Sequence, residues 1–127
     1  MKYSNENRGK IQNKAQALQV NDFSSLRFKN ITPTDIDGLI DFQNKKFVLI
    51  EIKYKDALLP FGQKLALERL CDNSKKDTIL MVGSHTSETG DIDVGGCILR
   101  EYRYKRAWKV YPEKITIKEA IKRFLKL

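Results

Sequence analysis

The sequence predicts an α/β protein in which helices flank one central mixed β-sheet. Three observations carry this prediction: a β-hairpin pattern over residues 35–55, a buried-strand pattern over residues 78–84, and helical patterns before, between and after the strands. Alternating strands and helices of this kind are typical of an α/β sandwich. With 127 residues, we expect a single domain over residues 1–127.

The first half of the chain predicts a helix and three strands. Residues 5–20 place Ile11, Ala15 and Leu18 at helical spacing, so we expect an amphipathic helix ending at Asn21 and Asp22. Residues 26–31 are expected to form a short strand. Apolar residues then alternate or run together over residues 35–42 and 46–55, and the loop 43–45 joins them as a hairpin.

The second half predicts two further helices with strands between them. Pro60 in a first turn opens a helix that runs through Cys71, and TILMVGS, residues 78–84, is typical of a buried strand. A loop over residues 86–96 precedes a strand-like segment, 96–109, with a hairpin turn near Lys105 and Arg106. Thr116 and Glu119 form a capping-box pattern before a last helix. The expected order is therefore α-β-β-β-α-β-β-α.

Composition indicates the kind of partner. The chain has 24 Lys and Arg against 16 Asp and Glu, a net charge of +8, and residues 100–127 hold ten of these bases against three Glu. Such an excess favours a polyanion, with nucleic acid as the first expectation. No apolar run reaches the roughly 18 residues of a membrane span, so we expect no membrane partner. Cys71 and Cys97 stand in apolar contexts, which predicts reduced core thiols and a cytoplasmic protein.

The hairpin carries charges that an apolar core does not require. If the loop is 43–45, paired positions place Asp37 opposite Glu51 and Asp35 opposite Lys53, all on one face. Two opposed carboxylates repel each other unless a cation lies between them, and Mg²⁺ accepts such oxygen ligands. Lys53 would then stand beside the metal. The alternative is a structural ion pair of Glu51 with Lys53 or Lys55.

Asp37, followed fourteen residues later by Glu51-Ile52-Lys53, resembles the D…(D/E)-x-K signature of the PD-(D/E)xK nuclease superfamily. The segments ITPTDIDGLIDF and FVLIEIKYKD also look like small phage-borne members and archaeal Holliday-junction resolvases. The resemblance implies a restriction-endonuclease-like α/β sandwich. It also implies Mg²⁺ or Mn²⁺ held by Asp37, Glu51 and the Ile52 backbone carbonyl, with Lys53 helping to activate water. Thr34 rather than Asp follows Pro33, so Asp35 stays an alternative ligand, although the register favours Asp37.

The resemblance also implies two supporting residues. Gln63, at the start of the second helix, matches a position from which family members reach the site or the scissile phosphate. The alternative for Gln63 is a solvated residue in the first turn. Glu6 matches a metal-binding Glu that family members often supply from the first helix. Glu6 projects away from the face of Ile11, Ala15 and Leu18, and its alternative is a solvated helix start.

Five further residues are candidates for nucleic-acid contact. His85 follows the strand 78–84, where α/β folds commonly place functional groups, and its alternative is an ordinary loop histidine. In YRYKRAWK, residues 102–109, cations alternate with aromatic rings as in nucleic-acid surfaces. The alternative there is an edge strand protected by its charges. The cations of this segment are Arg103, Lys105, Arg106 and Lys109.

The sequence thus predicts a Mg²⁺-dependent nuclease that hydrolyses phosphodiester bonds in DNA, with catalytic residues Asp37, Glu51, Lys53 and Gln63. By resemblance, it is expected to recognise a junction or flap, to be phage-encoded, and to form a homodimer that cuts two strands. Two alternatives stay open. One is a catalytically silent nuclease fold that binds nucleic acid, and the other is an RNA endonuclease.

Overall fold

The structure is a computed structural model that describes residues 19–127. The chain divides into two units, Met1–Pro33 and Thr34–Leu127. The second unit is an α/β structure, as expected, with five strands and two α-helices. In chain order its elements are β1 (Gly38–Phe42), β2 (Lys46–Tyr54), α1 (Phe61–Asp72), β3 (Asp77–His85), the 3₁₀ turn η3 (Val94–Gly96), β4 (Ile98–Tyr104), β5 (Ala107–Lys109) and α2 (Ile117–Leu125).

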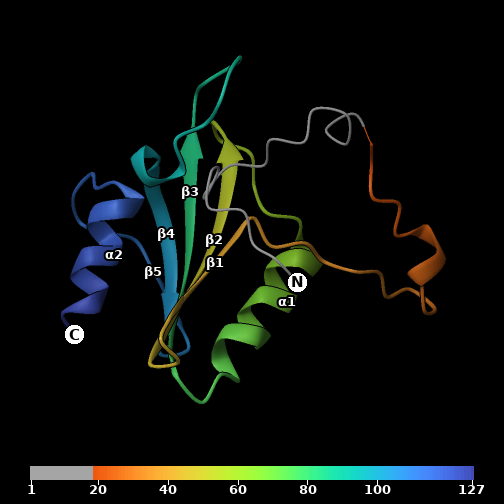
Figure 1. Ribbon diagram of the computed structural model, residues 1–127, viewed down its shortest axis with the longest axis horizontal. Helices are drawn as coiled ribbons and strands as arrows, with labels where there is room; N and C mark the ends of the chain where they lie inside the picture. Colours follow the sequence, from red (N-terminus) through yellow and green to blue (C-terminus); the bar gives the residue numbers. More distant parts are fainter. Residues whose placement is uncertain (1–18) are drawn as a thin grey trace, which may run out of the picture. The chain divides into compact units, whose positions relative to one another are not determined.

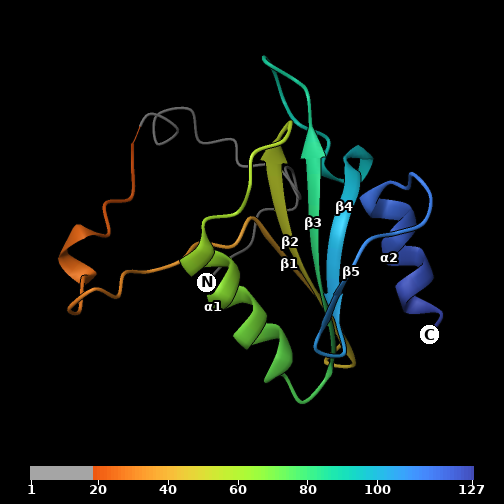
Figure 2. The ribbon, with the colours of Figure 1, turned by 180° about the vertical axis from the view of Figure 1, so that it is seen from behind.

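The five strands form one mixed sheet in the order β1-β2-β3-β4-β5. Strands β2 and β3 are parallel, and the other neighbours are antiparallel. Because a parallel pair needs a connection that returns the chain to the same end, α1 forms the crossover between β2 and β3. Figure 1 shows α1 and α2 on the two sides of the strands, and Figure 2 shows the same arrangement from behind.

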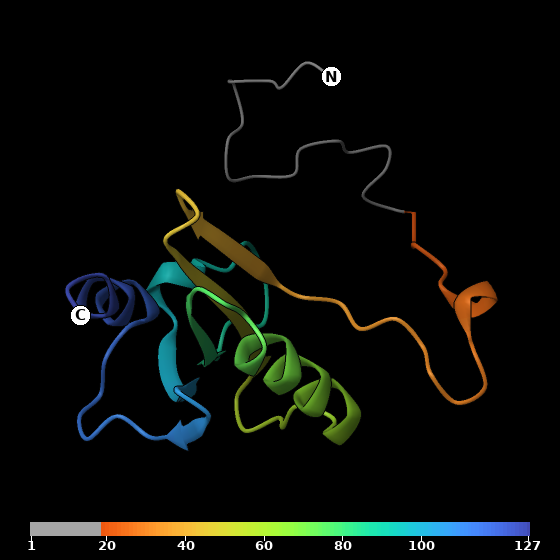
Figure 3. The same ribbon diagram turned by 90° about the horizontal axis from the view of Figure 1, so that it is seen from below.

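The two faces of the sheet hold separate cores, since side chains alternate along each strand. One face packs against α2 through Val48, Ile50, Met81, Ile117 and Phe124. The other face packs against α1 through a smaller cluster of Leu49, Leu67, Cys71 and Leu80, with Trp108 against it. The view along the strands separates the helices on either side (Figure 3). The apolar cluster on the α1 side is the smaller of the two.

The predicted hairpin register is confirmed. Leu39 pairs with Leu49 and Phe42 with Lys46, across a loop of residues 43–45. The predicted core face of the hairpin also packs against the α2 cluster, through Ile40, Phe42, Val48, Ile50 and Ile52. Ile36 is an exception and is exposed, because β1 begins only at Gly38.

The strand expected over residues 26–31 is wrong. Ser24–Leu26 form a 3₁₀ turn, η2, and Phe28 pairs only with Ile31, across a tight turn. Lys29 in that turn has a φ of 60°, so the backbone reverses direction where a strand would continue. Residues 5–18 of the expected first helix lie outside the described residues, and residues 19–23 are irregular.

The second half follows its sequence signals closely. The hairpin turn expected near Lys105 and Arg106 joins β4 to β5. Thr116 caps α2, because its side-chain oxygen accepts a hydrogen bond from the Glu119 N–H at 3.2 Å. Pro60 stands at the N-cap of α1, one residue earlier than expected. Cys71 and Cys97 are free and buried, as expected.

None of the helices within residues 19–127 is long and apolar enough to cross a membrane.

Candidate active site

The predicted acidic and basic residues meet at the end of the sheet where β2 and β3 finish. Glu51 and Lys53 lie near the end of β2, with side chains on the α1 face that Leu49 also occupies. Asp37 lies in a bend just before β1, the antiparallel neighbour of β2. We call Asp37, Glu51 and Lys53 the acid–lysine set.

The structure places Asp37 directly against Glu51 but outside the strand. The Asp37 N–H donates to Glu51 Oε1 at 3.4 Å, and the Ile52 N–H donates to Asp37 Oδ2 at 2.8 Å. The Asp37 carboxylate thus accepts the hydrogen bond that the Ile52 N–H of β2 would otherwise give to a backbone carbonyl of a neighbouring strand. This is why the expected strand 35–42 begins only at Gly38, and why Asp35 has no paired position opposite Lys53.

Glu51 is a buried carboxyl group in an otherwise apolar strand. Its side chain is only 1% exposed, and its neighbour across the parallel pair is the buried Val82. Burial, followed by a hydrogen bond and the negative charge of Asp37, raises the pKa of Glu51 to about 7, against the opposing effects of the Asp37 N–H and of Lys53. The fold therefore holds a carboxyl group where its charged form needs a compensating cation.

The raised pKa of Glu51 predicts that the metal-free protein loses stability as the pH rises. The pKa increases from 4.5 to about 7 on folding, so between these values the folded state binds more protons than the unfolded state. The free energy of unfolding should therefore fall across this window, by on the order of 3 kcal/mol for a shift of this size. Urea unfolding in metal-free buffer at several pH values measures this slope. Glu51→Gln should flatten it, and identical profiles for both proteins would contradict the prediction.

Gln63 reaches the same end of the sheet from the first turn of α1. Its side-chain Nε2 donates to the backbone carbonyl of Asp35 at 3.4 Å, which links α1 to the segment that carries Asp37. Asp35 itself is exposed, and this contact uses its main chain. Gln63 is thus brought to the segment just before Asp37, while Asp35 lies outside the paired hairpin.

Three charged residues that the sequence analysis missed lie on the α1 side of the sheet: Glu101, Lys64 and Arg100. Glu51, Val82 and Glu101 lie in one row across β2, β3 and β4, and Glu101 accepts an ion pair from Lys64 of α1 at 3.3 Å. The register of β3 and β4 shifts between Val82 and Gly83, and near this shift Arg100 donates to the Ala57 carbonyl at 2.6 Å. Sequence alternation alone could not assign these faces, because an irregularity in the ladder reverses them.

The chemistry of the acid–lysine set fits a hard divalent cation. No group of three or more His, Cys, Asp or Glu side chains within residues 19–127 could hold a metal ion. Mg²⁺ commonly uses one or two carboxylates and keeps several waters, so Asp37 and Glu51 are the two carboxylates of this set that could hold it. Ile52 contacts Asp37 through its N–H, whereas its predicted role uses its carbonyl. Glu6 lies outside the described residues.

His85 lies on the opposite face of the sheet. It aligns with Tyr54 at the end of β2, and the two rings are 5.4 Å apart on the side of Ile50 and Ile52. It lines a cavity of about 560 Å³ with Asp93 and Lys114, away from the acid–lysine set. Its Nδ1 is buried without a hydrogen-bond partner among the described residues. His85 is therefore not brought together with the predicted catalytic residues.

The four cations of residues 102–109 separate into two groups. Arg103 points toward α1 and forms a two-pronged ion pair with Asp72, at 2.9 and 2.7 Å. This pair lowers the pKa of the Asp72 carboxyl, because the guanidinium stabilises its charged form. Lys105, Arg106 and Lys109 are exposed, with Lys105 and Arg106 in the hairpin turn. The structure thus gives Arg103 an internal partner and leaves the other three at the surface.

Replacing Arg103 by Ala is expected to destabilise the fold by about 2 kcal/mol, because it leaves the largely buried Asp72 carboxylate without its partner. Urea unfolding at neutral pH measures the loss. Lys109→Ala, an exposed cation in the same hairpin, is the matched control and should change stability by less than about 0.5 kcal/mol. Equal losses of unfolding free energy in the two variants would mean that the Arg103–Asp72 ion pair contributes no more to stability than an exposed cation does.

No family model, curated protein or solved structure matches this chain.

Proposed function

We propose that this chain is a metal-dependent nuclease that hydrolyses phosphodiester bonds in DNA, with a nuclease-like fold of the PD-(D/E)xK kind. The observation that carries the proposal is Glu51: a carboxyl group, 1% exposed, hydrogen-bonded to Asp37 and two residues before a lysine on the same face. A protein rarely buries an unpaired carboxylate, because the loss of hydration is costly. Such an arrangement is typical of functional sites with perturbed pKa values.

Asp37 and Glu51 would hold Mg²⁺ or Mn²⁺. When bound, the metal would polarise the phosphate and lower the pKa of a coordinated water. The positive charge would also oppose the cost of ionising Glu51, whose pKa is raised to about 7 by burial and by Asp37. The Ile52 N–H holds the Asp37 carboxylate at 2.8 Å, so this ligand is oriented before a metal arrives. Orientation of this kind reduces the cost of assembling the site.

Lys53 and Gln63 have different roles in this proposal. No hydrogen bond or ion pair ties the Lys53 ammonium to another residue of the described chain, although its charge acts on Glu51. The ammonium would stabilise the negative charge that develops on the phosphate oxygens, or orient the attacking water. Gln63 contacts the Asp35 carbonyl, so it would position the Asp37 segment and approach the water from α1.

The net charge of +8 supports a polyanionic substrate. A protein that only binds nucleic acid gains nothing from the neighbouring carboxylates of Asp37 and Glu51, since carboxylates repel phosphate. The presence of these carboxylates in a basic protein therefore favours an enzyme over a protein that only binds nucleic acid.

The test is cleavage of a labelled four-way junction, a flap, a linear duplex, single-stranded DNA and RNA, with Mg²⁺ or Mn²⁺. We expect cleavage of at least one DNA substrate, complete loss on addition of a chelator, and recovery when metal is restored. Cleavage of RNA alone would assign the chain as an RNA endonuclease. Binding without cleavage of any substrate, at several metal concentrations, would overturn the enzyme proposal in favour of a binding protein.

A further inference from the structure

A pocket lies at the opposite end of the sheet from the acid–lysine set. It has a volume of about 320 Å³ and is formed by the end of α1, the α1–β3 loop and the β4–β5 turn. Figure 1 shows this loop and this turn at the same end of the strands. We call it the basic pocket, and it is lined by Cys71, Asp72, Ser74, Lys76, Asp77, Thr78, Tyr104, Lys105 and Arg106.

The acids of the basic pocket are already neutralised from inside the protein. Asp72 is held by the two-pronged pair with Arg103. Asp77 accepts from the Tyr104 hydroxyl at 2.7 Å and lies 3.6 Å from the Lys46 ammonium. The two cations that pair with these acids, Arg103 and Lys46, do not line the pocket, so the lining cations are left in excess.

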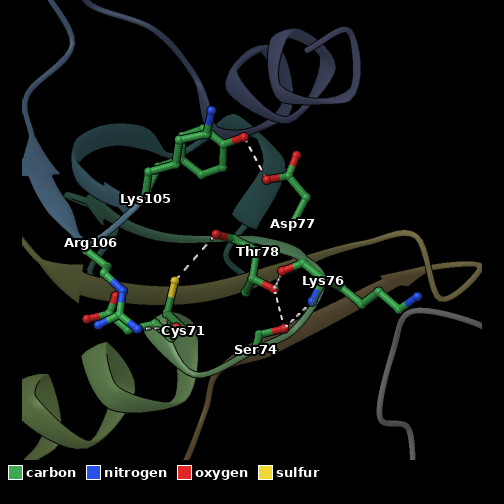
Figure 4. Close-up of a pocket in the computed structure, with 9 residues that line it drawn as sticks. Cys71, Ser74, Lys76, Asp77, Thr78, Lys105 and Arg106 are labelled. Carbon is green, nitrogen blue, oxygen red and sulfur yellow. Dashed lines mark hydrogen bonds between the residues drawn. The ribbon is translucent and has the colours of Figure 1, made fainter.

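Three exposed cations flank the opening. In Figure 4, Lys105 and Arg106 stand on one side, Lys76 extends outward on the other, and Ser74 and Thr78 lie between them. Arg106 donates to the backbone carbonyl of Asp72 at 3.4 Å, and Lys105 lies over the Tyr104 ring, so neither of these contacts pairs the cation with a carboxylate of the described chain. With the acids paired internally, the basic pocket carries an excess of three positive charges.

The turn that carries two of these cations adopts a strained backbone. Lys105 and Arg106 have φ values of 50° and 65°, the left-handed region in which two-residue hairpins usually have Asn and Gly. Long charged side chains at both positions cost conformational energy that Asn-Gly would avoid. Strain of this kind is commonly retained where the side chains serve a function. The thiol of Cys71 offers no competing chemistry, because burial raises its pKa to about 11.

We propose that the basic pocket binds phosphate groups of the same nucleic acid that reaches the acid–lysine set, as a second anchor on its backbone. This inference rests on the proposed function for the identity of the ligand. Lys76 and Arg106 would contact phosphate oxygens directly, with Lys105 adding charge beside them. The Lys46 end of β2 lies beside the pocket and the Lys53 end beside the active site, a span of about 23 Å. This span corresponds to about seven base pairs of duplex, which sets the minimum footprint.

The test variant is Lys105→Asn combined with Arg106→Gly, which removes two cations and supplies the residues that this turn prefers. It should therefore fold at least as stably as the wild type. Its affinity for a duplex longer than about seven base pairs, measured by fluorescence anisotropy without divalent metal, should fall about tenfold. The dependence of log Kd on log salt concentration should become shallower by about two, since two phosphate contacts are lost. Lys76→Gln, on the other loop, should weaken binding in the same direction.

The matched control is Lys118→Gln combined with Lys122→Gln, which removes two exposed charges from α2. Affinity and salt dependence should stay close to those of the wild type. Equal losses in both double variants would show a general charge effect and overturn the inference, as would unchanged binding by the turn variant. If inorganic phosphate raises the melting temperature of the wild type but not of the turn variant, while duplex binding is equal, the pocket binds only free anions.

Cleavage separates this inference from the proposed function. With Mg²⁺, the protein concentration that gives half-maximal cleavage should rise about tenfold for the turn variant, in proportion to its lost affinity. The Lys118→Gln and Lys122→Gln control should cleave like the wild type. A wild type that never cuts, but whose duplex binding depends on Lys105 and Arg106, would sustain the anchor and overturn the nuclease. A wild type that cuts, with no loss of affinity in the turn variant, would sustain the nuclease and overturn the anchor.

Discussion

Replacing Glu51 by Gln is expected to lower metal-dependent cleavage by about 10³-fold or more while leaving the fold at least as stable at neutral pH. Gln keeps the shape of the side chain but removes the charge that would hold the metal. It also removes the cost of ionising a group that is 1% exposed and whose pKa is raised to about 7 by burial and by Asp37. Single-turnover cleavage and urea unfolding, measured on the same preparation, separate these two effects.

The control for this substitution is Glu101→Gln. Glu101 lies in the same row of the sheet, two strands away, and its carboxylate is paired with Lys64 at 3.3 Å. We expect it to retain cleavage within a few-fold and to lose a little stability. Equal losses of cleavage in the two variants would mean that Glu51 acts only through the overall charge of the face.

Replacing Lys53 by Met is expected to lower cleavage by about 10²- to 10³-fold, the usual loss when one group that stabilises developing negative charge is removed. Met preserves an apolar stem of similar length, so packing on the α1 face is kept. Metal affinity should be unchanged within a few-fold, because the ligands Asp37 and Glu51 remain. Titration of Mn²⁺ by calorimetry, beside single-turnover cleavage, measures both quantities.

Lys55→Met provides the matched control two residues on. Lys55 follows the end of β2 and is exposed. Its ammonium lies over the Tyr54 ring and 3.9 Å from the Glu88 carboxylate. Its loss should leave cleavage nearly unchanged. If Lys53→Met weakens metal binding and cleavage by the same factor, Lys53 supports the ligands rather than the reaction, and its proposed role is wrong.

The predictions for Glu51 and Lys53 depend on a register that local chemistry could already indicate. The alternation of apolar residues over residues 46–54 and the three-residue loop place paired positions opposite each other, and the structure has this register. A one-residue slip in the pairing of β2 would turn the side chains of Val48 and Ile50 toward α1 and turn Glu51 toward the opposite face. The alternation of apolar residues along the strand is therefore enough to determine which side chains share a face, without reference to tertiary contacts.

The end of the hairpin could not be predicted in the same way. Asp37 was expected inside a strand, but its carboxylate accepts the Ile52 N–H and the chain bends there. Aspartate side chains compete with the backbone for hydrogen bonds, and the outcome depends on which N–H lies within reach. That competition is decided by where β2 lies relative to the bend, which no local pattern contains.

The roles of the cations in residues 102–109 show the same limit. The sequence placed Arg103 with Lys105, Arg106 and Lys109 as possible phosphate ligands, because all four carry the same charge in one segment. Arg103 meets Asp72, 31 residues earlier in the chain, only because β4 and α1 pack on the same face. The basic pocket arises likewise from two turns, at Ser74–Lys76 and Lys105–Arg106, that are distant in sequence.

The sequence by itself determined the α/β class of the described chain, the hairpin register and the common face of Glu51 and Lys53. These follow from short-range alternation and turn chemistry, which act between residues close along the chain. Only the tertiary structure decided the burial of Glu51, the internal pairing of Arg103, the position of His85 on the other face and the existence of the basic pocket. Each of these depends on which elements pack together, and packing joins residues that no local pattern relates.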